Sequence, residues 1–376
     1  MMPNIQETFL RILATFTFCI ISLNVSAQGD SSPAERFFSI EQDAPGLGEL
    51  IDPGAQLQIL GSRYGLTEGP VWVDDKDGGY LLFSDLISNV IYKWAPKEGT
   101  SVFLKKAGYS GNDIYTAGTQ TKRGRMNVIM IGPNGLTLDP QGRLVYLAPP
   151  DRRVMRLEKD GTRTVIADNY KGMKFSGPND LVYRSDGILY FTETIYGLRG
   201  VRGGHKSPYR ELPFTGVFMV KDGKVSLVID DKNLGGSPNG IAFSPDEKYL
   251  YLNAEFNRIM RYEVNKDGTL GKGIVFRKGE GSDGMKVDQW GNVYTTSGAG
   301  PGEVRITSPD GVRLGTIKLP IYNSEPRPQI CATNLAFGDS DSKGLYITAC
   351  EYVYRLQMKV PGIRPHNTGE LLNRRQ

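Results

Sequence analysis

The sequence predicts an all-β protein, a six-bladed β-propeller with four antiparallel strands in each blade. Three observations support this fold class. A hairpin pattern, made of an apolar β-rich run, an Asp/Gly/Ser turn and a run rich in Leu, Tyr and Val, occurs six times. A second, weaker hairpin follows most of these copies. No window keeps apolar residues at three-to-four spacing for more than a turn or two, which argues against helices.

The six copies define the blades in order along the chain. Their turns lie roughly 45 to 65 residues apart, which is the period of a propeller blade and not of a helical solenoid. The copies read VWVDDKDGGYLLFSD, LTLDPQGRLVYLA, LVYRSDGILYFTE, IAFSPDEKYLYLN, MKVDQWGNVYTTS and LAFGDSDSKGLYITA. Typical second hairpins are VMRLEKDGTRTVIA from Val154, VFMVKDGKVSLVI from Val217 and VRITSPDGVRLGTI from Val304. Two hairpins in each period make four strands in each blade.

The first 27 residues have the features of a secretory signal peptide. Arg11 precedes an apolar stretch from Ile12 to Val25, and Val25-Ser26-Ala27 forms a small-residue cleavage site. We therefore expect cleavage after Ala27 and a periplasmic or secreted protein. A membrane anchor is the alternative, but an anchor needs about 20 apolar residues. About 350 residues would remain, which ordinarily suggests two domains, but the repeats favour one.

The rest of the chain divides around the repeats. Residues 28–60 form a lead-in, and its segment Leu57 to Leu60 is expected to add a strand to the last blade and close the ring. The propeller is expected over residues 61–358, followed by an irregular C-terminal tail over 359–376. Two insertions, Lys105 to Asn127 and Ile195 to Phe214, interrupt the repeats and are expected to cover a face of the ring.

Charge and cysteine content narrow the class of partner. The formal net charge of +4 is too small and too scattered to indicate a nucleic-acid-binding protein. We expect a small-molecule substrate, with no membrane contact after signal cleavage. Cys331 and Cys350 flank the last hairpin, so they are either disulfide-bonded, as an oxidising compartment would allow, or two buried thiols.

Four repeats place a carboxylate or an amide beside Gly or Pro just before a strand-like run. These residues are Glu68 in TEGPVW, Asn179 in GPNDLVY, Asn239 in SPNGIAF and Asp283 in GSDGMKV. In a propeller, the loops that enter the innermost strands gather around one channel, so these side chains are expected to converge. Two carboxylates and two amides are hard oxygen ligands suited to Ca²⁺ and less specifically to Mg²⁺ or Mn²⁺, with Zn²⁺ a further possibility.

The other two repeats carry Asn134 and Asn334 at the same position, which makes them candidates for the substrate-binding rim. Tyr196, in the second insertion, is a further rim candidate. The alternative for the Asn and Asp positions is a simple turn residue, because Asn and Asp before Gly favour bonds from the side chain to the local backbone.

At these motifs the chain resembles the SMP-30/gluconolactonase family of six-bladed propellers. The matching segments are TEGPVW, GPNDLVYRSDGILYFTET, SPNGIAFSPDEKYLYL and SDGMKVDQWGNVYTT, in the order that the family has them, and the resemblance covers roughly residues 60–355. NGLTLDPQGRL and ELPFTGVFMV point to its longer bacterial, lactonase-like members. The chain departs from the family pattern at Gly177, where the animal branch has arginine, at Glu193, where Asp is usual, and at Asn253, where an acid often stands.

The resemblance implies a divalent-metal dependent hydrolase of sugar lactones, a gluconolactonase-like carboxylic ester hydrolase. Glu68, Asn239 and Asp283 would bind the metal, and Asn179 would be a further ligand or hold the substrate. Asp283 would also be the general base or the acid that steers the attacking water, so Asp283 and Asn179 are the catalytic candidates.

Two other functions stay open on the same fold. One is cleavage of phosphotriesters at the same metal site, and the other is a non-catalytic calcium-binding propeller. A serine hydrolase is disfavoured because the chain has no G-x-S-x-G motif and only two histidines, His205 and His366.

Overall fold

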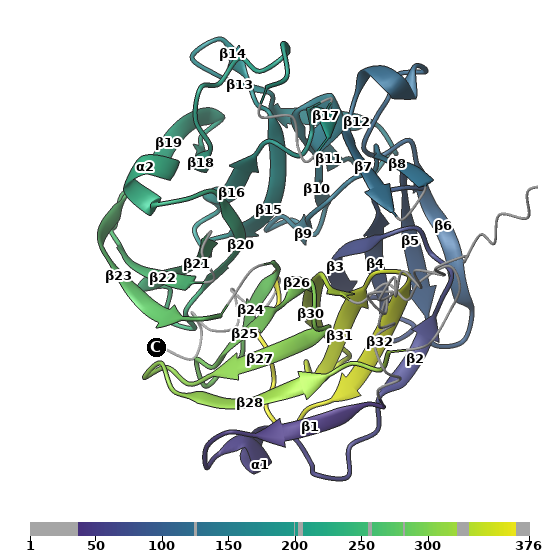
Figure 1. The fold of residues 1–376 in the computed structure, drawn as a ribbon, viewed down its shortest axis with the longest axis vertical. Coiled ribbons are helices and arrows are strands. Elements are labelled where there is room, and N and C mark those ends of the chain that lie inside the picture. Colours follow the sequence, from purple (N-terminus) through teal and green to yellow (C-terminus); the bar gives the residue numbers. More distant parts are fainter. Residues whose placement is uncertain are drawn as a thin grey trace, which may run out of the picture. The chain divides into compact units, whose positions relative to one another are not determined.

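The fold is a six-bladed β-propeller, as the repeats predict. The computed structural model describes residues 37–123, 126–198, 200–201, 206–254, 258–280, 283–321 and 331–365. These residues belong to one unit of the chain, residues 33–376. In Figure 1 the six sheets follow one another in chain order around a common centre. The expected signal peptide, His205 and His366 lie outside the described residues.

Each of the first three blades is a four-stranded antiparallel sheet. Blade 1 contains β3 (Thr67–Val73), β4 (Tyr80–Asp85), β5 (Val90–Ala95) and β6 (Gly99–Lys105). Blade 2 contains β9 (Leu136–Leu138), β10 (Leu144–Ala148), β11 (Arg153–Leu157) and β12 (Arg163–Ala167). Blade 3 contains β15 (Gly177–Tyr183), β16 (Leu189–Thr194), β18 (Gly216–Lys221) and β19 (Lys224–Asp230).

The other three blades repeat this arrangement, with one additional strand in blade 5. Blade 4 contains β20 (Pro238–Phe243), β21 (Tyr249–Ala254), β22 (Arg258–Val264) and β23 (Leu270–Lys278). Blade 5 contains β24 (Met285–Val287), β25 (Val293–Thr296), β27 (Glu303–Thr307), β28 (Arg313–Lys318) and β1 (Ser39–Gln42). Blade 6 contains β30 (Asn334–Gly338), β31 (Gly344–Ala349), β32 (Tyr352–Gln357) and β2 (Gln58–Gly61).

The lead-in adds a strand to two blades and closes the ring at the last one. β2 pairs antiparallel with β32, so the prediction that Leu57 to Leu60 adds a strand to the last blade is confirmed. β1 pairs antiparallel with β28, which the sequence did not indicate. The first strands of neighbouring blades contact one another all the way around, from β3 through β9, β15, β20, β24 and β30 back to β3. Closure therefore brings the N-terminal ends of all six inner strands to one axis.

The two insertions form one small sheet. The first insertion supplies β7 (Thr119–Arg123) and β8 (Met126–Met130), and the second supplies β17 (Gly200–Val201), which pairs parallel with β7. Minor pairs form between β13 (Asn169–Tyr170) and β14 (Met173–Lys174) and between β26 (Gly298–Ala299) and β29 (Cys331–Ala332). The described α-helices are single turns, α1 (Leu47–Leu50) and α2 (Asp231–Leu234), and 3₁₀ turns η1 (Ile114–Thr116) and η2 (Pro149–Asp151) complete the elements.

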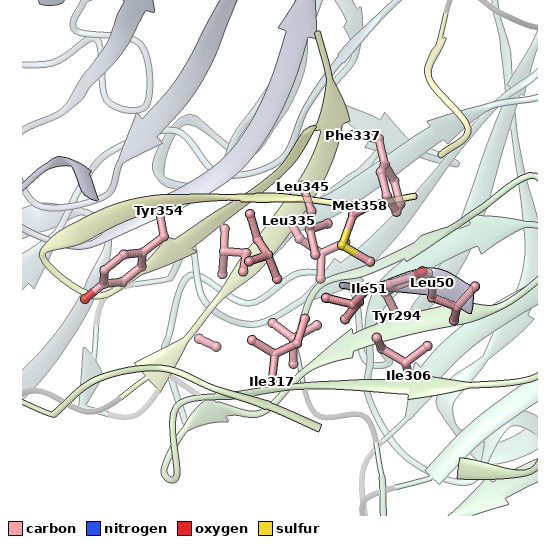
Figure 2. Packing of buried hydrophobic residues seen from close by; sticks show 14 of the residues in the cluster. Leu50, Ile51, Tyr294, Ile306, Ile317, Leu335, Phe337, Leu345, Tyr354 and Met358 are labelled. Atoms are coloured by element: carbon pink, nitrogen blue, oxygen red, sulfur yellow. The ribbon is translucent and has the colours of Figure 1, made fainter. Parts of the chain in front are cut away.

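The core lies between the faces of neighbouring blades. Figure 2 shows the largest cluster, where side chains of blades 5 and 6 meet those of α1. Tyr294 packs its ring edge-on against Phe337 at a centroid distance of 5.2 Å, and Leu50 and Ile51 are buried beside them. The apolar strands are thus covered on both faces, which explains why they are continuous apolar runs and not alternating ones.

The C-terminal tail, as far as it is described, crosses the channel end opposite the N-terminal ends of the inner strands. The amide of Ile363 donates to the carbonyl of Val287 at 3.0 Å, and Arg364 forms an ion pair with Asp74 at 2.6 Å. Asp288 and Gly362 form an isolated bridge. The amide of Gly362 also donates to the carbonyl of Ser342 at 2.8 Å, so these contacts hold a segment without regular structure against blades 1, 5 and 6.

Cys331 and Cys350 form a disulfide with a Cα–Cα distance of 5.5 Å. The bond joins the segment before β30 to the end of β31 and so fastens blade 6. Within the described part of the chain, no helix has the length and apolar character needed to cross a membrane.

Candidate functional site

The residues singled out by the repeats meet at one cavity. This cavity has a volume of about 370 Å³ and lies at the end of the channel where the inner strands begin. Five of the predicted positions line it: Glu68, Asn134, Asn179, Asn239 and Asp283. Tyr196 lines it as well, on the side of the second insertion. Cavities of roughly 300 to 1,000 Å³ are typical of small-molecule sites.

Asn179 and Asn239 lie inside β-bulges, and Glu68 directly precedes one. In blade 1 the register with β4 slips by one residue between Glu68 and Val71. The same slip occurs between Pro178 and Leu181 in blade 3 and between Pro238 and Ile241 in blade 4. A bulge leaves one residue unpaired and turns its side chain away from the ladder. The Gly and Pro residues of the motifs therefore mark bulges at the start of an inner strand.

Glycine after the polar residue also lets the next blade approach. A Cβ on Gly240 would lie 2.4 Å from the carbonyl oxygen of Asp283, and the Gly240 amide donates to that same oxygen at 3.1 Å. A Cβ on Gly284 would lie 2.3 Å from the side chain of Asn334. Any larger residue would separate the blades, so glycine is required for the polar side chains to converge.

The amides form a chain of hydrogen bonds around the cavity. Asn134 donates from Nδ2 to Oδ1 of Asn179 at 2.7 Å, and Asn179 donates from Nδ2 to Oδ1 of Asn239 at 2.7 Å. Asn239 in turn bonds to the carboxylate of Asp283. The amide dipoles thus align toward a carboxylate, which favours its charged form. On the other side of the ring, Asn334 donates to Glu68 Oε2 at 3.0 Å but does not line the cavity.

The carboxylates are confined in a way that disfavours negative charge. Burial, followed by the charge of Asp180, raises the pKa of Glu68 to about 7. Burial, followed by the charge of Glu68, raises the pKa of Asp283 well above its ordinary value. Lys286 opposes the shift at Glu68, as do the hydrogen bonds from Asn334 and Gly69. Several acidic groups with one nearby lysine therefore form a site that a cation would stabilise.

Asp180 belongs to this site, although the sequence did not single it out. Its side chain is 2% exposed and its Oδ2 finds no hydrogen-bond partner among the described residues. Burial raises its pKa, and Lys286 lowers it. One signal in the sequence could have indicated Asp180. The residue after Glu68 is Gly69 and the residue after Asn239 is Gly240, whereas the residue after Asn179 is the acidic Asp180.

The donor set fits a hard divalent cation. Glu68 and Asp283 offer carboxylate oxygens, Asn179 and Asn239 offer amide oxygens, and the partnerless Oδ2 of Asp180 lies in the same acidic group. Across the described residues, no three His, Cys, Asp or Glu side chains form a metal-binding cluster, so a cation here would depend on the amides. The structure brings these residues together, while their roles as ligands and catalysts stay predictions.

Comparison with known proteins places the propeller in a family. Residues 66–351 match the model of the SMP-30/Gluconolactonase/LRE-like region. Over 338 residues the chain is 32% identical to a gluconolactonase of Zymomonas mobilis, with 86% of this chain and 87% of that protein covered. The matched region contains every inner strand and every polar position described above.

Solved structures share the same fold. A gluconolactonase from Xanthomonas campestris aligns with a TM-score of 0.67 and 24% identity, covering 87% of this chain and 98% of that one. A calcium-binding protein, regucalcin, from Agrobacterium tumefaciens aligns with a TM-score of 0.61 and 18% identity, covering 83% and 96%. At these identities the likeness shows the fold.

Proposed function

Because the chain belongs to the SMP-30/gluconolactonase/LRE-like family, we propose that it is a gluconolactonase-like lactone hydrolase that acts on sugar lactones with the help of a divalent cation. The observation that carries this proposal is the convergence of Glu68, Asn179, Asn239 and Asp283 on one cavity. Because the chain is homologous to a gluconolactonase, we expect the reaction at this cavity to be hydrolysis of a lactone.

The reaction adds water across the ring ester. Water attacks the carbonyl carbon, the ring C–O bond breaks, and the ring oxygen leaves as a hydroxyl group, so that the product is a hydroxy acid. Asp283 accepts the proton of the attacking water and can return a proton to the leaving oxygen. Its position beside the cavity suits a group that must exchange protons with the attacking water and the leaving oxygen.

The amides orient the substrate. Asn179 lies between Asn134 and Asn239 in the hydrogen-bond chain, so its side chain is held in one orientation. An amide held in this way presents a fixed dipole to the lactone carbonyl and does not need to reorganise during the reaction. Glu68, bonded to Asn334, completes the acidic side of the cavity.

Glu68, Asn179, Asn239 and Asp283 would hold the cation, with Ca²⁺ the first choice because all four offer hard oxygen atoms. When bound, such an ion supplies Lewis-acid polarisation of the ester carbonyl. The Ca²⁺-binding relative from Agrobacterium tumefaciens supports this choice of ion.

The test is hydrolysis of glucono-δ-lactone by pH-stat after chelation, with Ca²⁺, Mg²⁺, Mn²⁺ or Zn²⁺ added back. We expect metal-restored turnover that Asp283→Asn lowers by about 10² or more, in the range typical of a lost proton-transfer group. Asp310→Asn, in an exposed turn of the same blade, is the matched control and should keep wild-type turnover. Turnover of a phosphotriester with no lactone would instead support the phosphotriesterase alternative, and calcium binding without turnover would support a binding protein.

We also propose that the chain is exported after cleavage at Ala27. The disulfide between Cys331 and Cys350 supports export, because such bonds persist in oxidising compartments. N-terminal sequencing of the protein from fractionated cells would test it, and a cytoplasmic protein that retains its first residues would refute it.

A further inference from the structure

One side of the cavity wall is apolar. The residues that line this side come from blades 1 and 2 and from the two insertions. They are Leu66, Leu86, Met130, Pro149, Pro150 and Tyr196. Apart from Thr119 on β7, the polar lining residues lie on the floor of the cavity, at the ends of the inner strands, and on the side of blades 5 and 6, where Ser297, Gly298 and Thr333 line it.

Backbone hydrogen bonds join the segments that carry the apolar lining residues. The amide of Leu86 donates to the carbonyl of Leu66 at 2.9 Å, and the amide of Gly132 donates to the carbonyl of Leu86 at 2.6 Å. Met130 is paired with Thr119 across β7 and β8. These bonds connect blade 1 to the first insertion, so Leu66, Leu86 and Met130 belong to one surface.

The second insertion completes the same surface. Thr119 donates its hydroxyl to the carbonyl of Tyr196, and the amide of Gly118 donates to the carbonyl of Gly197 at 3.2 Å. The two insertions are therefore tied together at the cavity, and Tyr196 is held next to β7. We name this surface, made of Leu66, Leu86, Met130, Pro149, Pro150 and Tyr196, the apolar wall.

Three hydroxyl groups of the cavity each have a hydrogen-bond partner within the protein. Thr119 bonds to Tyr196, Thr333 donates to the carbonyl of Thr67 at 2.7 Å, and Ser297 accepts from the amide of Glu303 at 3.0 Å. A lactone that carries hydroxyl groups on every ring carbon would place some of them against the apolar wall. A buried hydroxyl without a partner is unfavourable, whereas an apolar group there would be stabilised by leaving water.

The cavity has room for more than a lactone ring. Its volume of about 370 Å³ exceeds twice that of an engineered protein cavity of about 150 Å³ that holds benzene, a ring of similar size. A ring placed at Glu68 and Asp283 would leave space along the apolar wall. The space and its lining both fit an apolar substituent.

We propose that the preferred substrate is a lactone whose ring carries an alkyl or aryl substituent, with the substituent against the apolar wall. This inference rests on the proposed lactone hydrolysis, and it replaces the sugar lactone as the preferred substrate by a lactone with an apolar substituent. The ring ester lies over the acidic floor, and the substituent extends between Met130 and Leu86. Each methylene that becomes buried there strengthens binding by about fourfold.

The experiment compares kcat/KM for glucono-δ-lactone and for a δ-lactone with an n-pentyl chain, in the metal-loaded protein. We expect a preference for the alkyl lactone of about tenfold or more, which is the scale on which apolar pockets discriminate. Met130→Gln and Leu86→Gln should each lower that ratio severalfold. Val165→Gln, an exposed position on the outer strand of blade 2, should leave the ratio unchanged.

Preference for glucono-δ-lactone, or a ratio unchanged in both Gln variants, would overturn the inference. If neither lactone is hydrolysed, the proposed function fails, and the inference is decided separately by calorimetry with the two matching lactams, which mimic the rings but resist hydrolysis. Tighter binding of the alkyl lactam, weakened in Met130→Gln, would support the apolar wall as a substituent site. Tighter binding of the hydroxylated lactam would overturn it.

Discussion

Asn253 in blade 4 donates a hydrogen bond from its side-chain amide to the main-chain carbonyl oxygen of Asp283 in blade 5. Asn253 is fully buried at the end of β21, and the Gly240 amide donates to the same oxygen. The backbone of the acid at the cavity is thus held from the neighbouring blade by two donors. The position of Asp283 depends on how blade 4 packs against blade 5.

This contact predicts that Asn253 positions Asp283. Asn253→Leu removes the donor at similar volume, and we expect kcat to fall by about tenfold to a hundredfold, since small displacements of a catalytic group have effects of that size. Steady-state kinetics should show the loss mainly in kcat, with weaker cation binding. Asn265→Leu, in an exposed turn of the same blade, is the control. A lower melting temperature with unchanged kcat would show that Asn253 is only structural.

A second prediction concerns the cation and stability. Glu68, Asp180 and Asp283 are buried close to one another, and burial raises the pKa of each. A cation that binds only the folded protein should stabilise it by about 2.7 kcal/mol at a concentration a hundred times its Kd. Thermal unfolding with Ca²⁺ and with chelator measures this effect. Glu68→Gln should reduce it, and an equal melting temperature under both conditions would contradict it.

A third prediction follows from Glu193, at the end of β16. Its side chain accepts from the amides of Ser176 and Gly177, and burial raises its pKa from 4.5 to about 8. The folded protein therefore holds this proton more tightly than the unfolded chain does. The stability that this protonated side chain contributes to the folded protein is fully present below the pKa of Glu193 in the unfolded chain. It is lost as the pH rises through about 8, the pKa in the folded protein.

Glu193→Gln should consequently flatten the pH dependence of the free energy of unfolding. As the pH rises, the free energy of unfolding of the variant is expected to increase relative to that of the wild type, by up to about 5 kcal/mol above the pKa of the folded protein. Reversible denaturation between about pH 5 and pH 9 measures the difference. Glu263→Gln, at an exposed position, serves as the control. Parallel stability curves for wild type and Glu193→Gln would refute the prediction.

A fourth prediction concerns the C-terminal segment. A Cβ on Gly362 would lie 1.7 Å from the ring of Phe337, which is 2% exposed and cannot move freely. We expect Gly362→Ala to destabilise the protein by about 1 to 3 kcal/mol, as overpacking does. Gly48→Ala is the matched control, because a Cβ at this helical position meets nothing within 4 Å and should be neutral or slightly stabilising. Denaturation curves that coincide for both variants would contradict this account.

Much of the fold could be predicted because its information is local. Each blade has its own turn residues and apolar runs, so six copies of one pattern predict six blades, and the segment near Leu57 was predicted to close the last one. β1 was missed because a single short strand at a sheet edge has no repeat to compare with. The pairing of β17 with β7 was missed because insertions follow no period.

For the site, the sequence predicted which polar residues converge. Glu68, Asn179, Asn239 and Asp283 stand at or just before the start of an inner strand in four repeats, and the starts of the inner strands of a closed ring meet at its axis. Asp180 escaped notice because its importance comes from its burial beside Glu68 and Asp283, which no local pattern records.

Only the tertiary structure decided what surrounds those residues. The apolar wall joins Leu66, Met130 and Tyr196, which are far apart in the chain, and Asn253 acts on Asp283 across a blade boundary. Such contacts depend on ring closure and on the pairing of the two insertions. Both bring together distant segments, and the sequence of one segment does not indicate which other segment it will contact. The sequence by itself therefore determined the blades and the polar residues at the axis, while packing between blades decided the shape and polarity of the cavity.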